Sequence, residues 1–380
     1  MIYMDAASTA PPRQEVLDLV TPLLTNNFGN PASLHELGHQ ARRANDWSRN
    51  QVAGHLSVEE SEIYFTSGGT ESDNTAVIGG ALANPRGKVV VSSSIEHPAV
   101  LEACAYLVRI HGFTHRLIPV DEFGIVDLHA ANELIDDQVS VVSVMAVNNE
   151  VGTIQPIKEL AELAHAAGAL MHTDAVQAAG WLDLAELTAH VDALSLSGHK
   201  IGALKGSGVL YVSNRYDVLP LLHGGGQQGG LRSGTENPAA SVGIARALQL
   251  CAEQRQAGAG DSYGDYLIER ITKELGKIDP GLVQVTGHRE QRIGGIVSLV
   301  FPRTAGETVL IELERRGVLC SSGSACAAGS TDPSPVLTAM GYDEQLAHTA
   351  VRLSFTRVAK ENEISQVASA VVATVKSLVA

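Results

Sequence analysis

Short apolar runs rich in β-branched residues alternate with longer segments of helical periodicity from about residue 60 to residue 212. The predicted strands are Glu62–Thr66, Lys88–Ser92, Thr114–Pro119, Val139–Met145, Ala169–His172, Ala193–Ser195 and Gly208–Val212. The predicted helices are Thr70–Asn84, Pro98–Gly112 and Ile157–Gly168. The last two end at a glycine, which suits a helix C-terminus. This alternation favours a mostly parallel α/β sheet wrapped by helices.

The pattern changes after the glycine-rich stretch that runs from His223 to Gly230. A long helical region, from Pro238 to Ile278, then leads into a separate mixture of strands and helices. Apolar residues near the C-terminus follow helical spacing and predict an amphipathic closing helix: Ile364, Val367, Val371, Val375 and Leu378. We therefore expect two domains, a large one over residues 15–255 and a small one formed by residues 1–14 and 256–380.

Composition describes a globular protein with a large core, since 44% of the 380 residues are hydrophobic and 18% are charged. A net charge of −15 argues against a surface built for nucleic acid. The first residues lack the basic and apolar regions of a signal peptide, and the most apolar window, residues 139–147, is too short to span a membrane. The 4 cysteines show no Cys-x-x-Cys spacing, which indicates free thiols in a reducing cytoplasm and no metal site.

Lys200 and Asp174 each follow an apolar β-type stretch, so both are expected at strand ends, where α/β sheets present their ligand sites. Either residue by itself would more often be structural. Together they are what a pyridoxal 5′-phosphate (PLP) enzyme needs, because a lysine amine forms a Schiff base with the aldehyde and a carboxylate keeps the pyridine nitrogen protonated. The pair therefore predicts a PLP site.

A phosphate site is indicated by the segment Phe65-Thr-Ser-Gly-Gly-Thr-Glu-Ser72, which joins a predicted strand to a predicted helix. Gly69 and the glycine before it let the backbone approach an anion, and Thr70 offers a hydroxyl. Alone, this pattern also suits a simple capped turn. Ser197 and His199 lie close to the candidate lysine in sequence and add further donors, as a PLP phosphate requires.

Three more polar residues lie where predicted strands give way to helices or turns. His97 suits an imidazole that stacks on the pyridine ring and transfers a proton near the substrate, although a histidine at a helix start also commonly bonds to backbone. Asn149 and Gln177 carry amides that would bond to the phenolic oxygen of the cofactor, or would serve as turn and cap residues. The sequence leaves both alternatives open for each residue.

Arg352 interrupts an apolar β-type run, where a buried guanidinium needs a partner. One candidate partner is a substrate carboxylate bound in bidentate fashion. The other is an acidic side chain of the same chain, which would make Arg352 a structural residue.

Cys326 lies among glycine, serine and alanine, a setting that favours a thiol able to swing into a site over one packed in a core. Cys104 and Cys251 fall on helical patterns and are expected in the core. Cys320 ends an apolar run and is also expected to be packed. We therefore single out Cys326 as the candidate nucleophile.

Taken together, the sequence resembles the cysteine desulfurases of the NifS and IscS type, which are class V aminotransferase-like PLP enzymes of fold type I. The resemblance covers essentially the whole length. It rests most on three motifs: Ser197-Gly-His-Lys200, Arg232-Ser-Gly-Thr-Glu-Asn237 and Ser321-Ser-Gly-Ser-Ala-Cys326. It implies a large α/β domain with a mostly parallel seven-stranded sheet and a smaller α+β C-terminal domain that carries the catalytic cysteine loop. The chain departs from the family's usual Gly-Pro-Lys, because Ala203-Leu-Lys205 stands in that place.

The resemblance implies how the cofactor is held. Lys200 would be the Schiff-base lysine, Asp174 would pair with the pyridine nitrogen, and His97 would stack on the ring as a catalytic residue. The amides of Asn149 and Gln177 would lie near the cofactor oxygen or the substrate. The phosphate would be bound by residues of the same subunit and by one from its neighbour: Gly69, Thr70, Ser197, His199 and, from the neighbour, Thr235.

The same resemblance implies the reaction and the partners. L-cysteine would become L-alanine, with its carboxylate on Arg352 and its sulfur moved to Cys326 as a persulfide. Because Thr235 would complete the neighbouring site, the chain is expected to form a homodimer. A sulfur-acceptor protein would serve iron–sulfur assembly, tRNA thiolation or DNA phosphorothioation. The alternatives are a selenocysteine lyase or a class V transaminase, and a transaminase has no use for Cys326.

Overall fold

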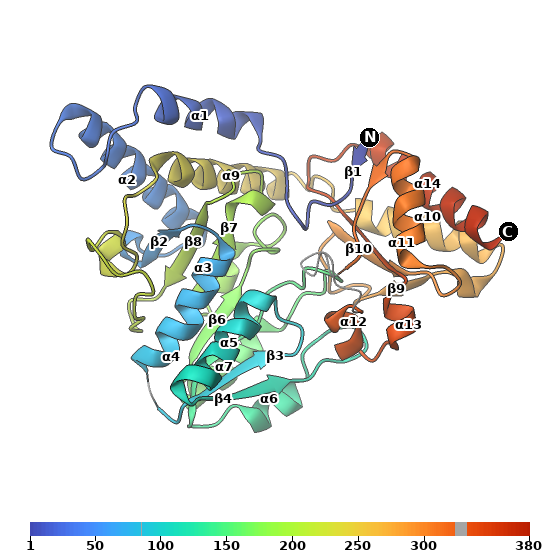
Figure 1. The fold of residues 1–380 in the computed structure, drawn as a ribbon, viewed down its shortest axis with the longest axis horizontal. Helices are drawn as coiled ribbons and strands as arrows, with labels where there is room; N and C mark the ends of the chain where they lie inside the picture. The colour runs from blue at the N-terminus through green and yellow to red at the C-terminus, as the bar shows by residue number, and fades with distance from the viewer. Residues whose placement is uncertain (85, 324–332) are drawn as a thin grey trace.

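A computed structural model describes residues 1–84, 86–323 and 333–380. Its largest element is a seven-stranded sheet in the order β2-β8-β7-β6-β5-β3-β4 (Figure 1). The strands are β2 (Ile63–Thr66), β3 (Val89–Ser93), β4 (Thr114–Ile118), β5 (Val139–Ser143), β6 (Leu170–Asp174), β7 (Ala193–Ser197) and β8 (Gly208–Val212). Only β8 runs antiparallel to its neighbours, so the predicted, mostly parallel sheet is confirmed.

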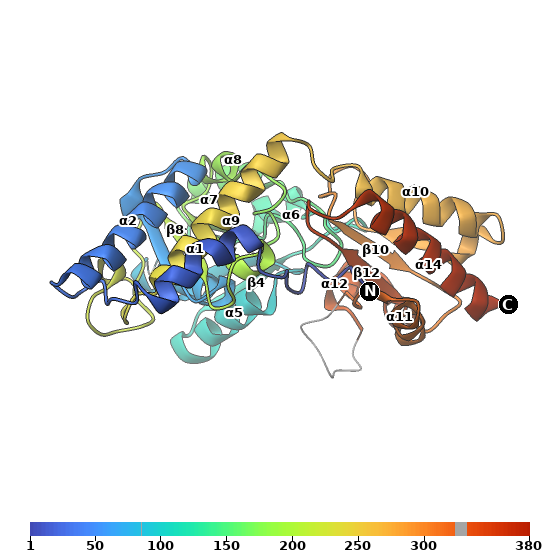
Figure 2. The ribbon, with the colours of Figure 1, turned by 90° about the horizontal axis from the view of Figure 1, so that it is seen from above.

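Helices cover both faces of this sheet, because successive strand residues bury their side chains on opposite sides. Val90 and Val141 pack with a π-helical turn (Thr75–Gly79), α4 (Gly80–Ala83) and α5 (Pro98–His111), and α3 (Gly69–Asn74) lies against β7 and β8. Val89 and Val142 belong to the core of the other face. The helices there are α1 (Gln14–Thr25), α2 (Glu36–Leu56), α6 (Leu128–Leu134), α7 (Ile157–Ala167), α8 (Leu184–Thr188) and α9 (Pro238–Gln256). Figure 2 shows α1 and α2 against α9.

The predicted helices that end at glycine are confirmed, since α5 and α7 are followed by Gly112 and Gly168 in the left-handed conformation. The long helical region after residue 238 is two helices, α9 and α10 (Tyr263–Gly276), with positive φ at Gly258 and Gly260 between them. Within the described ranges, no helix combines the length and the apolar character needed to cross a membrane.

A smaller body follows in the chain, built on an antiparallel sheet in the order β12-β10-β9. Its elements are β9 (Gln284–Thr286), β10 (Ile296–Val300), α11 (Gly306–Arg315), α12 (Pro335–Ala339), α13 (Glu344–Ala347), β12 (Ala350–Ser354) and α14 (Glu361–Val379). The predicted closing helix is α14. It buries Ile364, Val367, Val371 and Val375 against α10 and the small sheet, whereas Leu378 is only partly buried.

The first residues of the chain belong to the smaller body in space. Strand β1 (Ile2–Tyr3) pairs in parallel with β11 (Val318–Leu319), and Asp5 forms an isolated bridge with Ser354 of β12. The chain then crosses to α1 on the larger body (Figure 1). We call the crossing segment, residues 5–9, the N-terminal strap.

Candidate active site

A cavity of about 540 Å³ lies at the carboxyl ends of β6 and β7, beside the N-terminal strap. This is the end of a parallel sheet at which α/β proteins bind ligands, and the volume suits a small cofactor with its substrate. Most of the residues predicted for the site line it: Gly69, Thr70, His97, Asn149, Asp174, Gln177, Ser197, His199, Lys200 and Arg352. Residues from distant parts of the chain thus meet in one place.

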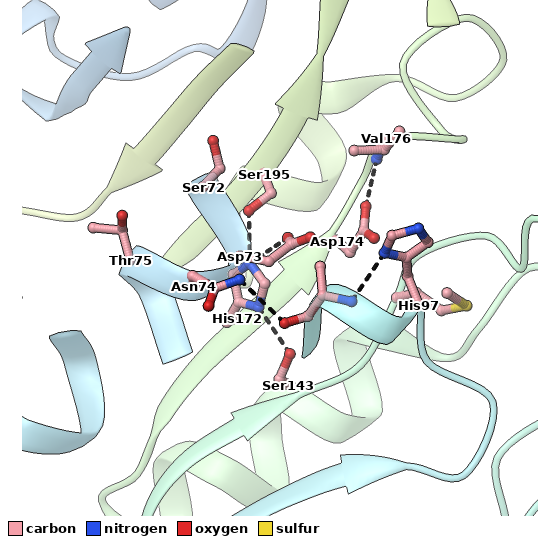
Figure 3. A network of polar contacts seen from close by, with 12 residues as sticks. Ser72, Asp73, Asn74, Thr75, His97, Ser143, His172, Asp174, Val176 and Ser195 are labelled. Carbon is pink, nitrogen blue, oxygen red and sulfur yellow. Dashed lines mark hydrogen bonds and ion pairs between the residues drawn. The ribbon is translucent and has the colours of Figure 1, made fainter. Parts of the chain in front are cut away.

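Asp174 ends β6 and is almost fully buried at the cavity wall. Its Oδ1 accepts a hydrogen bond from the backbone N–H of Val176 at 2.8 Å (Figure 3). Burial raises the pKa of Asp174, and the charges of His97 and Lys200 oppose that rise. A protonated pyridine nitrogen placed against this carboxylate would add the positive charge that a buried carboxylate needs.

Lys200 lies in the 3₁₀ turn Gly198–Lys200, directly after β7. Its Nζ donates hydrogen bonds to two backbone carbonyls of the strap, those of Ala7 and Ser8, the latter at 2.9 Å. The turn and the strap therefore hold the amine at the cavity that Asp174 also lines.

His97 occupies the position just before α5, and its Nδ1 accepts a hydrogen bond from the Ala99 N–H at 3.1 Å (Figure 3). In the neutral ring this bond leaves the proton on Nε2. The ring also lines the cavity. The backbone bond at a helix start is therefore present, and the ring also lines the cavity, while its stacking on the cofactor and its proton transfer stay predictions.

The turn from Ser67 to Thr70 forms another wall of the cavity. A Cβ on Gly69 would come within 2.8 Å of a Val176 methyl group, so this close approach requires glycine. His199 forms a 3.1 Å hydrogen bond from Nδ1 to the Thr9 hydroxyl. Burial, together with the nearby lysines, lowers the pKa of His199 to about 4, so its ring is neutral.

At this wall a phosphate would be bound by side-chain hydroxyls, by backbone N–H groups and by a lysine ammonium group. Ser197 lies directly against the glycines, since a Cβ on Gly69 would stand 3.6 Å from the Ser197 Cβ. Lys205, which the sequence analysis did not single out, also lines the cavity and supplies a positive charge. This donor set fits the phosphate of PLP.

Arg352, in β12, is a deeply buried cation at the site, with a side chain only 2% exposed. Its Nη1 donates to the Asn149 carbonyl at 2.8 Å, and its Nη2 forms an ion pair with Asp5 at 3.1 Å. The internal acidic partner considered from sequence is therefore present, although Arg352 lines the cavity as well. Gln177 also contacts the strap, because its Nε2 donates to the Ala7 carbonyl at 3.0 Å.

Two predicted residues are not among those lining this cavity in the described part of the chain. For Cys326 nothing follows from this, because it lies outside the described residues. Thr235 is exposed and lines a separate hollow of about 250 Å³, which shares only Ser67 and Gly206 with the main cavity. Thr235 therefore does not line the cavity of its own subunit.

The other cysteines are packed, as predicted. Cys104 and Cys251 are buried in the cores of the large sheet. Cys320 packs against the core of the smaller body, and burial raises its pKa to about 12. A thiol that keeps its proton at neutral pH is a poor nucleophile, so the structure does not favour Cys320 as the reacting thiol.

A polar network that the sequence did not predict reaches the cavity through Asp73 (Figure 3). Asp73, on α3, is buried, lines the cavity, and lies 3.7 Å from Nε2 of His172. His172 also bonds to Ser143 at 2.8 Å and to Ser195 at 2.9 Å. Burial raises the pKa of Asp73, which Asp174 raises further, and lowers the pKa of His172 to about 3. Nothing in the pattern of residues 70–84 separates Asp73 from an ordinary polar helix position.

Comparison with known proteins identifies the family of the chain. The aminotransferase class-V family matches residues 2–367, so the chain belongs to that family. It is 40% identical to the cysteine desulfurase IscS of Methanosarcina thermophila over 99% of this chain and 92% of the relative. It is 39% identical to the cysteine desulfurase NifS of Azotobacter vinelandii over 96% of this chain and 90% of the relative.

Solved structures agree with these relatives. A NifS-like protein superposes with a TM-score of 0.90 at 32% identity, covering 99% of both chains. SspA in complex with cysteine superposes with a TM-score of 0.81 at 31% identity, covering 94% of this chain and 99% of the other. Within the class V family, the chain belongs with the cysteine desulfurases of the NifS and IscS type.

Proposed function

We propose that the protein is a PLP-dependent cysteine desulfurase, which converts L-cysteine to L-alanine and transfers the sulfur to Cys326. The observation that carries this proposal is the meeting of Lys200, Asp174 and Arg352 at one cavity. An amine, a buried carboxylate and a buried guanidinium are what a PLP enzyme for an amino acid needs. The cysteine desulfurases among the relatives support the choice of substrate.

The residues around the cavity fit PLP at both of its ends. Asp174 would hold the pyridine nitrogen, and the turn around Gly69 and Thr70 would hold the phosphate together with Ser197 and His199. The bound cofactor supplies an electron sink, which makes the Cα proton of the amino acid acidic and weakens the Cβ–S bond.

The side chains of the chain then position the substrate and move its protons. Lys200 would provide the amine that holds the cofactor, and its Nζ can carry a proton to or from the substrate. His97 lines the cavity and would carry its proton on Nε2, because Nδ1 is engaged by the Ala99 N–H. Arg352 binds the α-carboxylate and so fixes which end of the substrate faces the lysine.

The sulfur transfer uses the Cys326 thiolate as nucleophile. A bond forms between the Cys326 sulfur and the substrate sulfur while the Cβ–S bond breaks, and its electron pair remains with the carbon fragment. Protonation of that fragment gives alanine. The balance is one L-cysteine and one Cys326 thiol in, and one L-alanine and one Cys326 persulfide out, with no external oxidant or reductant.

Two further expectations belong to this proposal. Thr235 would bind the phosphate of a neighbouring subunit in a homodimer, which is supported by its exposure and by its absence from its own cavity. The persulfide would pass to an acceptor protein in the cytoplasm, for iron–sulfur assembly, tRNA thiolation or DNA phosphorothioation. A reducing compartment suits the described cysteines, which are free thiols.

The test compares Cys326→Ala with its neighbour Cys320→Ala. Cys326→Ala is expected to bind PLP normally and to release no sulfide from L-cysteine, whereas Cys320→Ala keeps most activity because that thiol is packed and protonated. Sulfide release at the parent rate by Cys326→Ala would sink the persulfide step. If both variants stayed fully active, a lyase without a protein persulfide would be the better assignment.

A further inference from the structure

The N-terminal strap contacts several candidate catalytic residues at the cavity. The Ala7 carbonyl accepts hydrogen bonds from Gln177 and Lys200, and the Thr9 hydroxyl bonds to His199. The strap is tied to the smaller body as well, since the Ala7 N–H donates to the Ser354 hydroxyl at 2.9 Å. The strap is therefore part of the site wall.

Most donors of the Arg352 guanidinium are already engaged. The two hydrogens of Nη2 serve Asp5 at 3.1 Å and the Ser8 hydroxyl at 2.8 Å. Those of Nη1 serve the carbonyls of Asn149 at 2.8 Å and Gly323 at 3.3 Å. The fifth donor, Nε–H, is buried and has no hydrogen-bond partner within the described residues. These contacts fix the plane of the guanidinium and leave one donor unused.

The two acceptors on Nη2 differ in where they lie. Ser8 lines the cavity, as Arg352 does, whereas Asp5 is not among the residues of the cavity wall. The Ser8 hydroxyl joins the two groups, because it accepts from Arg352 and donates to Asp5 Oδ1 at 2.7 Å. Asp5 thus contacts Arg352 away from the cavity wall, whereas Ser8 contacts Arg352 at the cavity wall.

We propose that Asp5 is a positioning residue for the substrate carboxylate, because its ion pair holds the Arg352 guanidinium, and that Ser8 adds its hydroxyl to the same carboxylate. This inference rests on the proposed function, in which Arg352 binds that carboxylate. The carboxylate would take the Nη2 hydrogen that the Ser8 oxygen accepts in this structure, so that the guanidinium binds the substrate beside Asp5. When the carboxylate arrives, the Ser8 O–H rotates from Asp5 to the substrate, and Asp5 keeps its ion pair.

This arrangement makes the strap a determinant of specificity. The carboxylate of an amino acid forms an ion pair with the Arg352 guanidinium, which Asp5 already orients, and accepts a hydrogen bond from the Ser8 hydroxyl. An amine without a carboxylate gains neither of these contacts. The site therefore favours α-amino acids over simple amines through residues that lie outside the seven-stranded sheet.

The proposal is tested by steady-state kinetics of the PLP-loaded enzyme with Asp5→Asn and Ser8→Ala. We expect KM for L-cysteine to rise about tenfold in Asp5→Asn and about threefold to fivefold in Ser8→Ala, with kcat within about twofold of the parent. Inhibition by the product L-alanine should weaken in parallel. Inhibition by ethylamine, which lacks the carboxylate, should stay the same.

Ser354→Ala is the matched control, because it removes the acceptor of the Ala7 N–H and leaves the guanidinium contacts in place. Its KM should stay within about twofold of the parent. If KM rose as much in Ser354→Ala as in Asp5→Asn, the position of the strap, and not the ion pair of Asp5 with Arg352, would set the affinity for L-cysteine, and the proposal would fail. The melting temperature of each variant reports whether its fold is kept. Ser8→Ala loses only one oxygen atom, so it tests the proposal even if Asp5→Asn folds poorly.

Arg352→Ala separates this inference from the proposed function. If its KM for L-cysteine stays at the parent value, the carboxylate is not bound by Arg352 and that part of the proposed function fails. If Arg352→Ala raises KM and Asp5→Asn does not, only the role of Asp5 fails. A lower KM in Asp5→Asn would mean that Asp5 competes with the substrate, which overturns the inference.

Discussion

Glu96, next to His97, is a buried carboxyl whose titration should be visible in the stability of the protein. Its Oε1 accepts hydrogen bonds from the Ser93 hydroxyl and from the Met145 N–H, the latter at 2.9 Å. Its Oε2 is buried without a hydrogen-bond partner in the described parts of the chain. Burial raises the pKa of Glu96 from 4.5 to about 8, so the group is mostly protonated at neutral pH.

The sign of the pH dependence follows from this raised pKa. The folded chain holds the Glu96 proton more tightly than the unfolded chain does, so its contribution to stability is full below pH 4.5 and is lost as the pH rises to about 8. A loss of about 1.4 kcal/mol per pH unit over that window amounts to roughly 5 kcal/mol. Glu96→Gln keeps the shape and stays neutral. It should match the parent at pH 5 and be about 4–5 kcal/mol more stable at pH 9.

Urea unfolding of the parent and of Glu96→Gln at pH 5, 7 and 9 measures this difference. Glu102→Gln is the control, because Glu102 is exposed on α5, the helix that begins two residues after Glu96, and its replacement should change stability little at any pH. A difference between the parent and Glu96→Gln that is the same at pH 5 and pH 9 would refute the reasoning. So would a Glu96→Gln variant that is less stable than the parent at pH 9.

Lys200→Ala is expected to abolish turnover and to leave PLP bound without a covalent link. Borohydride reduction and peptide mapping of the parent should find the phosphopyridoxyl group on Lys200, and a label on another lysine would contradict the assignment. Light scattering should give about twice the 40.0 kDa chain mass, since Thr235 is expected to complete a neighbouring site, and a fully active monomer would contradict this. Arg357→Ala should lower the free energy of unfolding by about 2–4 kcal/mol, because the buried guanidinium lies 4.4 Å from the Trp181 ring and bonds to the Ala259 carbonyl. Chemical denaturation measures that loss, and an unchanged midpoint would argue against it.

The large sheet could be predicted from the sequence because its strands are short, apolar and bounded by turns. The predicted strands all occur, with ends that differ by one or two residues, and Gly208–Val212 agrees at both ends. Helices α1 and α2 were not predicted. α2 is amphipathic but mostly polar, and it becomes a helix by packing against α9. The domain boundaries after residues 14 and 255 stay a prediction.

The site could be predicted where a residue type carries its own chemistry and stands at a strand end. Lys200 and Asp174 meet that condition, and the structure brings them to one cavity. The roles of Asp5, Ser8 and Asp73 could not be predicted, because each depends on a contact between segments far apart in the chain. Asp5 meets Arg352, and Asp73 meets His172, only after the fold has formed.

The path of the N-terminal strap also has a consequence for the order in which the protein assembles. Residues 2–5 find their partners more than 300 residues later in the sequence, since Ile2 pairs with Val318 and Asp5 with Ser354 and Arg352. Closing so long a loop is entropically unfavourable, and it cannot occur before residue 354 has been made. The large sheet, with Asp174 and Lys200, can form well before that point, because its strands end at Val212. The lysine and carboxylate for the cofactor can thus come together during synthesis, whereas the wall that would hold the substrate carboxylate cannot form until β12 has been made.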